Sequence, residues 1–328
     1  MNTPALHTGT THGLTVARAH TADTSNRRPL VLTDMRNLAL HAMGLLLLGL
    51  IFHVAPVHAT VMAEFDGGAD TPLTLEEFGN TGSLSIEASG GNPGGFLRLT
   101  EDGVPSQHNY ASFDNTDAGA FSTSSFSFDF RITDNTDGST ADGFSFSYAD
   151  TGTYGTSGGL GSAPFFSGEH PIAADVLGFS FDTWWNGSDD GPTPGTSDDL
   201  SEVSVFWDGA LVDRIDDTRL LTPVLTLDDG LWHTVTGLVD FDAATVSLSV
   251  DGNALFTDLA VPGLTPFESR ILYAARTGGA VQESAIDNVL VEFGGTTAVP
   301  EPGTLLLLLL GAVGILLTQG RRRHYQAF

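Results

Sequence analysis

The stretch Phe126-Ser-Phe128-Asp-Phe130-Arg-Ile132 decides the fold class, because apolar and polar side chains alternate along its whole length. Successive side chains of a strand point to opposite faces, so this alternation predicts a strand with one buried face. Phe144-Ser-Phe146-Ser-Tyr148 repeats the pattern after a turn. Each of the two stretches therefore predicts a strand with one buried face.

Similar strand candidates lie on both sides of this pair, at 83–88, 96–99, 176–181, 203–207, 232–239, 245–250 and 286–293. Clusters of Gly, Asp, Asn and Ser separate them, and Asp208-Gly209 and Asp251-Gly252 have the sequence of tight hairpin turns. No stretch of residues 60–298 has a helical stripe. About a dozen short strands without helices predict an all-β fold, a sandwich of two antiparallel sheets.

The charge of the central region excludes one class of partner. Residues 60–298 hold 6 arginines, no lysine and 37 acidic residues, of which 27 are aspartates, so their net charge is about −31. Such a surface repels phosphate backbones, which excludes nucleic-acid binding. The aspartates suit loops that bind hard cations and equally suit a solvated acidic surface, and both interpretations stay open. The chain has no cysteine, so disulfides, thiol catalysis and cysteine-ligated metals are excluded.

The N-terminal segment has the pattern of an export signal. Arg36 precedes an apolar run from Leu45 to Ile51, and Val57-His58-Ala59 offers a small-residue cleavage site. We therefore assign residues 1–59 to an N-terminal extension and signal peptide. The residues before Met35 are either a long start of that signal or the product of an upstream start codon, and we favour Met35 as the true start.

The C-terminal segment, residues 296–328, combines three features. Pro300-Glu301-Pro302 follows Val299, an apolar run covers 304–319, and three arginines stand at 321–323. The arrangement resembles the PEP-CTERM sorting signal of Gram-negative bacteria that make extracellular polysaccharide. That resemblance implies processing by an exosortase, a transient inner-membrane helix and a final place at the cell surface or in the extracellular matrix. An ordinary single-pass anchor is the alternative.

Three blocks within residues 60–295 resemble the L-type (legume, concanavalin A-like) lectins. They are Ala141-Asp142-Gly143-Phe144-Ser145-Phe146, the stretch Gly178-Phe-Ser-Phe-Asp182-Thr-Trp184-Trp185-Asn186, and Ile271-Leu-Tyr-Ala-Ala-Arg-Thr-Gly278-Gly279 followed by a last strand at 286–293. Trp232-His233 resembles the start of a back-sheet strand of that fold. The resemblance implies a concanavalin A-like sandwich that binds carbohydrate.

The resemblance also implies site residues. The carbohydrate-binding set would be Asp142, Gly143, Asn186, Trp184, Gly278 and Gly279. A Ca²⁺ ion would be held by Asp182, the carbonyl of Trp184, Asn186, and Asp189 or Asp190. Ser180 stands where the family has a metal-binding glutamate, so we expect the adjoining transition-metal site to be lost.

Simpler interpretations of these residues remain open. Asp142 could be a plain turn residue, the acidic loop could hold no ion, and Gly278-Gly279 could merely form a turn. Of the adjacent Trp184 and Trp185, we expect at least one in the core.

The residues favour binding over catalysis. His108, His170 and His233 share no metal-ligand spacing, and we interpret all three as structural or surface residues. No Glu-x-Asp-x-Glu or Glu-x-Asp-x-x-Glu string, no Gly-x-Ser-x-Gly elbow and no paired histidines occur in the central region. We predict an exported, non-catalytic, calcium-dependent protein that binds carbohydrate or exopolysaccharide. A structural or adhesive matrix protein without a sugar site is the alternative, and a glycoside hydrolase is a more distant one.

Overall fold

The computed structural model describes residues 59–67, 71–81, 83–133, 138–160, 168–187, 190 and 200–296. All of them belong to one compact unit, Pro56–Phe328. Residues 1–58 of the expected signal peptide (1–59) and residues 297–328 of the expected sorting segment (296–328) lie outside the described residues.

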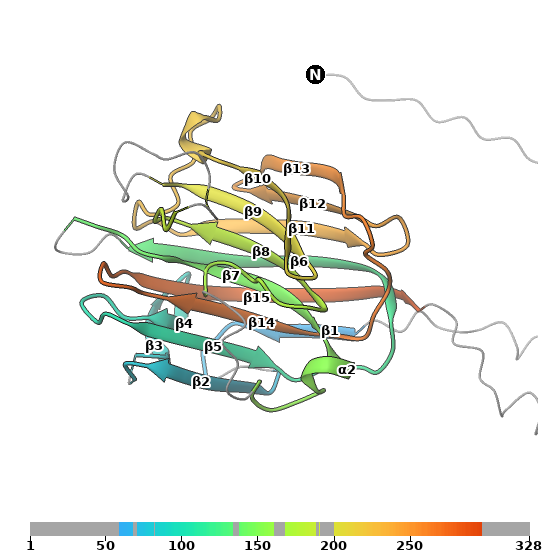
Figure 1. Ribbon diagram of the computed structural model, residues 1–328. Helices are drawn as coiled ribbons and strands as arrows, with labels where there is room; N and C mark the ends of the chain where they lie inside the picture. Colours follow the sequence, from blue (N-terminus) through green and yellow to red (C-terminus); the bar gives the residue numbers. More distant parts are fainter. Residues whose placement is uncertain are drawn as a thin grey trace, which may run out of the picture. The chain divides into compact units, whose positions relative to one another are not determined.

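Fifteen described strands form two antiparallel sheets, as the alternation predicted (Figure 1). The first sheet has the order β13-β12-β11-β6-β15-β4-β3, and β1 pairs with β15 beside β4. Its strands are β1 (Ala59–Ala63), β3 (Ser85–Gly91), β4 (Gly94–Thr100), β6 (Phe121–Thr133), β11 (His233–Asp240), β12 (Thr245–Val250), β13 (Asn253–Ala260) and β15 (Glu283–Thr296).

The second sheet has the order β10-β9-β8-β7-β14-β5-β2. Its strands are β2 (Leu73–Gly79), β5 (Gln107–Phe113), β7 (Gly143–Asp150), β8 (Val176–Asp182), β9 (Glu202–Trp207), β10 (Ala210–Ile215) and β14 (Ser269–Arg276). The helical turns among the described residues are α2 (Thr151–Tyr154) and η2 (Thr218–Leu220). The sequence pattern therefore predicted the fold class correctly.

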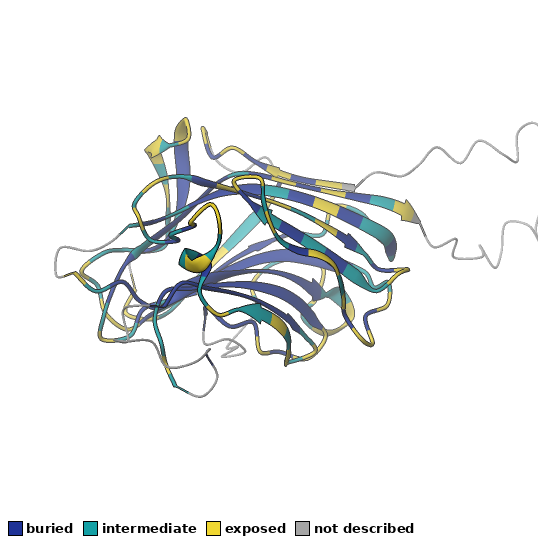
Figure 2. Cartoon of the chain, turned by 90° about the horizontal axis from the view of Figure 1, so that it is seen from above, coloured by how far each residue is buried: buried dark blue, intermediate teal, exposed yellow. Residues whose placement is uncertain are grey.

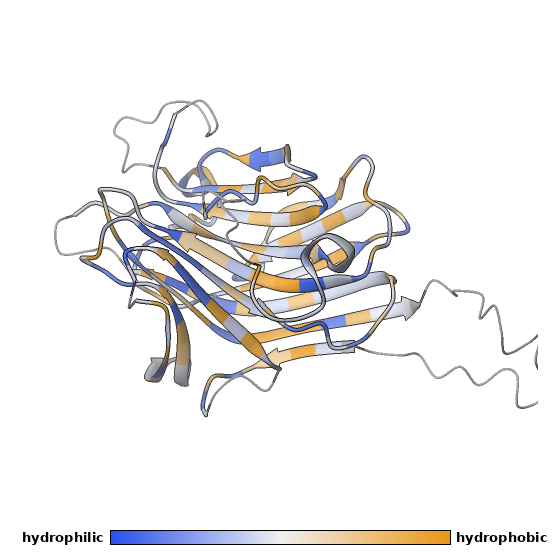
Figure 3. Ribbon diagram, turned by 60° about the horizontal axis from the view of Figure 1, so that its bottom comes forward, coloured by the Kyte–Doolittle hydropathy of each residue, from blue (hydrophilic) through white to orange (hydrophobic). Residues whose placement is uncertain are grey.

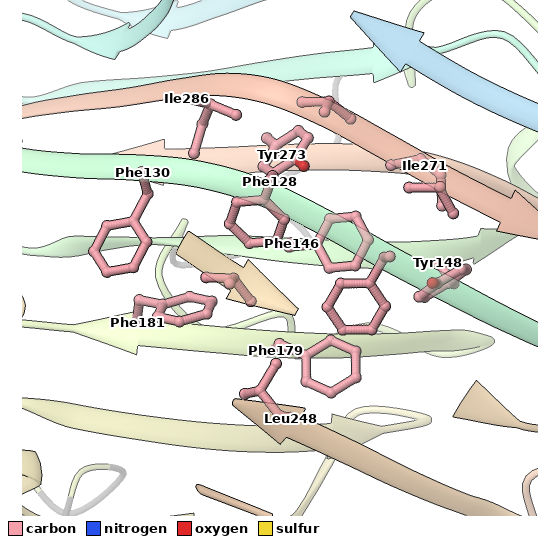
Figure 4. Packing of buried hydrophobic residues seen from close by; sticks show 14 of the residues in the cluster. Phe128, Phe130, Phe146, Tyr148, Phe179, Phe181, Leu248, Ile271, Tyr273 and Ile286 are labelled. Atoms are coloured by element: carbon pink, nitrogen blue, oxygen red, sulfur yellow. The ribbon is translucent and has the colours of Figure 1, made fainter. Parts of the chain in front are cut away.

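The core is an aromatic layer between the two sheets. Phe128 and Phe130 of β6 are fully buried, and the ring of Phe128 lies 5.2 Å from that of Phe146 in β7 (Figure 4). The rings of Phe144 and Phe181 stack at 4.7 Å. Figure 2 shows buried residues along the strands of both sheets, and Figure 3 shows apolar and polar bands alternating along the strands. A dense aromatic core compensates for the missing disulfides by burying apolar area.

Both predicted hairpin turns are present. Asp208 and Gly209 join β9 to β10 with φ of 50° and 77°, and Asp251 and Gly252 join β12 to β13 with φ of 51° and 75°. Two consecutive residues with positive φ match the right-handed twist of the flanking strands, which is why Asp-Gly suits these turns.

Candidate metal and ligand site

The first feature of the site is the meeting of three strand ends at one rim of the second sheet. Gly143, the first residue of β7, pairs with Asp182 at the end of β8 and with Arg276 at the end of β14. These ends lie where the arrows of β8 and β14 point in Figure 1. Asp142 precedes β7, and its backbone N–H donates to the Arg276 carbonyl at 3.1 Å.

Gly143 is required where it stands. Its φ is +141°, and a Cβ there would lie 2.2 Å from the Phe181 carbonyl oxygen. A side chain at position 143 would therefore force β7 away from β8. The absence of a side chain at Gly143 lets Asp142 approach the end of β8 closely. The peptide bond between Ala141 and Asp142 is cis.

A second segment, residues 168–173, lies across the outer face of this sheet. Gly168 has a φ of +94°, and a Cβ there would lie 2.7 Å from the Arg276 Cβ. Ser145 of β7 donates a hydrogen bond of 2.7 Å to the Gly168 carbonyl. The close approach brings Glu169 and His170, both buried, to the rim that holds Asp142 and Asp182.

Arg276 joins two buried carboxylates. Its Nε lies 3.1 Å from Asp142 Oδ2 and its Nη2 lies 2.6 Å from Glu169 Oε1. The Asp142 and Glu169 side chains are only 3% and 1% exposed. The amide of Asn186, which is exposed, donates to Asp142 Oδ1 and to Glu169 Oε1, at 3.3 Å in each case. Asn186 and Asp142, two residues that the lectin resemblance placed together, are therefore neighbours.

His170 corrects one expectation, since we had assigned it no metal-ligand role. Its Nε2 lies 3.0 Å from Asp182 Oδ2 and 3.6 Å from Asp190 Oδ1, and its ring packs on Phe206 of β9 at 5.3 Å. One ligand atom from each of His170, Asp182 and Asp190 falls within 4.8 Å of the others. His170 precedes Asp182 by 12 positions, so no short ligand spacing in the sequence indicates this three-residue cluster. The two residues meet because the chain reverses direction before β8.

The pKa values of the cluster reflect burial among like charges. Burial raises the pKa of Asp142, with the Arg276 charge opposing the rise. Burial and the charge of Asp182 raise the pKa of Glu169 well above its ordinary value. Burial raises the pKa of Asp182 to about 7 against the hydrogen bond to His170. Burial alone lowers the pKa of His170, but the bond to Asp182 outweighs it and raises that pKa to about 9. The cluster therefore holds protons that a bound divalent cation would displace.

The loop after β8 gathers most of the expected calcium ligands. The Trp184 N–H donates to Asp182 Oδ1 at 2.9 Å, the Asn186 amide donates to the Trp184 carbonyl at 3.4 Å, and the Asn186 N–H donates to Asp190 Oδ2. Asp189 lies outside the described residues.

The donor set fits a divalent cation. Glu169 Oε2 is buried and has no hydrogen-bond partner among the described residues, and the buried Asp182 Oδ2 lies 3.0 Å from His170 Nε2. Carboxylate and carbonyl oxygens suit Ca²⁺, whereas the His170 nitrogen suits Mn²⁺ or Zn²⁺. Ser180, at the position of the expected glutamate, is buried in β8 and supplies only a hydroxyl.

The remaining predicted residues differ in their placement. A Cβ on Gly278 would lie 3.5 Å from Asp142 Oδ2, so this loop does border the cluster, while Gly279 faces open space. Trp184 and Trp185 are both half-buried, so the expectation that one belongs to the core was wrong. The reason is that β8 ends at Asp182, and the strand alternation we applied to the pair stops before it.

His233 lies in the first sheet, with its two ring nitrogens 2.7 Å from Asp251 and 3.1 Å from Asp229. His108 lies in β5 and is half-buried. Neither joins the cluster found around His170.

One comparison with known protein families concerns the C-terminal segment of the chain. Residues 298–323 match the family model described as the PEP-CTERM protein-sorting motif, which indicates an exported protein and implies processing by an exosortase. No curated protein matches the chain. Among the described residues, none of the helical segments has the length and apolarity needed to cross a bilayer.

Several solved lectins resemble the chain at low identity. The lectin from Bauhinia forficata in complex with GalNAc is 16% identical, with a TM-score of 0.47, over 74% of this chain and 100% of the lectin. The Lotus tetragonolobus seed lectin is 13% identical, with a TM-score of 0.48, over 74% and 99%. The exoplasmic/lumenal domain of VIP36, in its Ca²⁺/Man3GlcNAc-bound form, is 13% identical, with a TM-score of 0.44, over 70% and 89%.

Proposed function

We propose that this protein is an exported carbohydrate-binding protein that holds sugar hydroxyls at the rim formed by Asp142 and Asn186, without catalysis. The contact between these two side chains, 3.3 Å apart, is the observation that carries the proposal. An ionised carboxylate accepts strong hydrogen bonds from hydroxyls, and the amide beside it can both donate and accept. The pair therefore suits the vicinal diol of a sugar.

Access to Asp142 is controlled by Asn186. Asp142 is 2% exposed, and the exposed Asn186 amide is bonded to it and to Glu169. A sugar that reaches Asp142 must therefore take over the hydrogen bonds that Asn186 makes. Gly278, which has no side chain, borders Asp142 and leaves room for a ligand on the other side.

We further propose that Ca²⁺ orders this rim. Asp182, Asp190, Asn186 and the Trp184 carbonyl would hold the ion, which would supply positive charge among four acidic groups. Its binding would favour the ionised carboxylates and fix the loop that carries Asn186. The predicted place of action, the surface or matrix of a Gram-negative bacterium after transient anchoring in the inner membrane, agrees with the sorting motif at residues 298–323.

A glycan array tests the proposal directly. The purified mature protein is applied with calcium and with a chelator, beside the Asp142→Asn variant. Calcium-dependent binding that the variant loses supports the proposal. Absence of binding in every condition refutes the sugar site and favours the alternative, an adhesive matrix protein whose acidic surface, with a net charge near −31, gathers cations. Release of reducing sugar from polysaccharides would instead support hydrolysis.

The identity of the ion needs a separate measurement. Calorimetric titration of the metal-free protein with Ca²⁺, Mn²⁺ and Zn²⁺, repeated with His170→Gln, separates oxygen-only coordination from coordination that includes the imidazole. We expect Ca²⁺ binding to survive the substitution. If the protein binds Mn²⁺ or Zn²⁺ but not Ca²⁺, and the variant loses that binding, one of these two ions and not calcium is the cofactor.

A further inference from the structure

The chain continues past β8 with Thr183, a fully buried residue that holds the backbone of Asp142. The Thr183 N–H donates to the Asp142 carbonyl at 3.0 Å, and the Thr183 hydroxyl lies 3.2 Å from the same oxygen. On the other side, the Asp142 N–H donates to the Arg276 carbonyl at 3.1 Å. Both backbone polar groups of Asp142 are therefore bonded at the ends of the strands that flank β7 in the sheet, β8 and β14 (Figure 1).

The Thr183 side chain is in turn bonded to a residue that leads into the first sheet. Its hydroxyl donates at 2.8 Å to Oε1 of Gln282, the residue before β15, and Gln282 Nε2 donates to Ser284 Oγ at 2.9 Å. The Ser284 N–H donates to the hydroxyl of Thr100, in β4, at 3.0 Å. A chain of hydrogen bonds therefore runs from Asp142, at the rim of the second sheet, to Thr100 in the first.

Burial makes this chain of bonds sensitive to the loss of any member. Its four side chains are all 0% exposed, at one end of a core that is largely aromatic: Thr100, Thr183, Gln282 and Ser284. A buried polar group that loses its partner stays desolvated, so each member keeps the geometry that satisfies it. The bond to Gln282 is the shorter of the two that the Thr183 hydroxyl makes, and it fixes the rotamer that brings this hydroxyl to the Asp142 carbonyl.

The position of the Asp142 carboxylate depends on its backbone as well as on its side chain. Arg276 and Asn186 contact the carboxylate, whereas Thr183 holds the carbonyl of the same residue. Hydrogen bonds to a carboxylate weaken within a few tenths of an ångström, so a shift of this backbone changes how well a hydroxyl is bound. We propose that Gln282 is a positioning residue of the sugar site, which acts on Asp142 through Thr183. This inference rests on the proposed function and adds to it a buried residue that no sugar can touch.

Two substitutions break the chain of bonds at different members. Gln282→Leu removes the acceptor of the Thr183 hydroxyl, and Thr183→Val removes the hydroxyl and keeps the branched shape. Binding of the methyl glycosides of glucose, galactose and mannose is measured by calorimetry with saturating calcium, and urea unfolding gives the stability of each variant. Both variants should bind about threefold to tenfold more weakly than the wild type, which is the factor that one neutral hydrogen bond contributes. Thr183→Ser, which restores the hydroxyl, should bind like the wild type.

The matched control is Ser124→Ala, which breaks another buried hydroxyl bond between the two sheets. Ser124 of β6 lies 3.0 Å from the hydroxyl of Tyr148, near the other end of β7. This variant should lose a similar amount of stability and keep the affinity for the glycoside.

The outcomes separate this inference from the proposed function. Unchanged affinity in both Gln282→Leu and Thr183→Val overturns the positioning role and leaves the proposed function standing. The same conclusion follows if Ser124→Ala weakens binding as much as they do, or if Thr183→Ser fails to restore it, because general destabilisation or altered packing then explains the loss. Failure of the wild type to bind any of the three glycosides overturns the proposed function and this inference with it.

Discussion

Arg276 offers the sharpest test of how the site is held together, through the substitution Arg276→Met. The substitution keeps most of the side-chain volume and removes the charge that lies 3.1 Å from Asp142 and 2.6 Å from Glu169. Two carboxylates that are 3% and 1% exposed would then lose the guanidinium that contacts both, which leaves His170 as the remaining positive charge of the cluster. Burial has already raised the pKa of both, so the folded state must either bind protons or bear the unpaired charge.

The size of the effect follows from the burial of the partners. Removal of one member of a buried ion pair costs about 3–5 kcal/mol, because the other charge stays desolvated. The Arg276 side chain is 22% exposed, so we expect the lower end, about 3 kcal/mol. Addition of Glu169→Gln should recover part of the loss by removing one of the two stranded charges.

Urea unfolding at neutral pH in the presence of a chelator measures this loss. Arg98→Met is the control, because the Arg98 side chain is 19% exposed but its partner Glu87 is 34% exposed. That variant should lose about 1 kcal/mol or less. If Arg276→Met costs no more than Arg98→Met, burial of the partners is not what makes Arg276 important, and our account of the cluster is wrong.

Four further results are expected. Asp182→Asn should abolish the rise in melting temperature that calcium causes, whereas Asp129→Asn, in the other sheet, should keep it. A rise in both variants would mean that calcium binds at another site. Gly143→Ala should lower the free energy of unfolding in urea by more than about 3 kcal/mol, because φ is +141° and the new Cβ would meet the backbone of β8. A loss below about 1 kcal/mol would contradict the close packing of β7 on β8 at this position. Phe128→Ala should cost about 3–5 kcal/mol in the same assay, and a much smaller loss would mean the aromatic layer is loose. Without metal, the free energy of unfolding measured by calorimetry should fall between pH 5 and pH 8. The pKa of the Asp182 carboxyl is about 7 in the folded protein and lower in the unfolded chain, so the contribution of Asp182 to stability is complete below about pH 4 and is lost as the pH rises through 7. A rise in stability over this range would contradict that reasoning.

The strands and their turns were predictable because their signals are local. Alternation along Phe126 to Ile132 follows from the two-residue period of a strand, and the Asp251-Gly252 turn follows from the positive φ that both residues tolerate. Such patterns involve residues that are neighbours in the chain, so they can be identified without knowledge of the rest of the molecule. The same locality explains the error at Trp184 and Trp185, where the pattern was extended past the end of its strand.

The composition of the site depended on tertiary structure. Asp142, Asp182 and Asn186 could be proposed from the lectin-like blocks, but nothing in the chain near them indicated Glu169, His170 or Arg276. These three join the cluster because the ends of β7, β8 and β14 align in register and the segment at Gly168 folds onto them. The alternation of side chains by itself determined that this protein forms two stacked sheets. Which charges meet at their rim was decided by strand register and close packing, which act between residues far apart in the chain and leave no periodic trace in it.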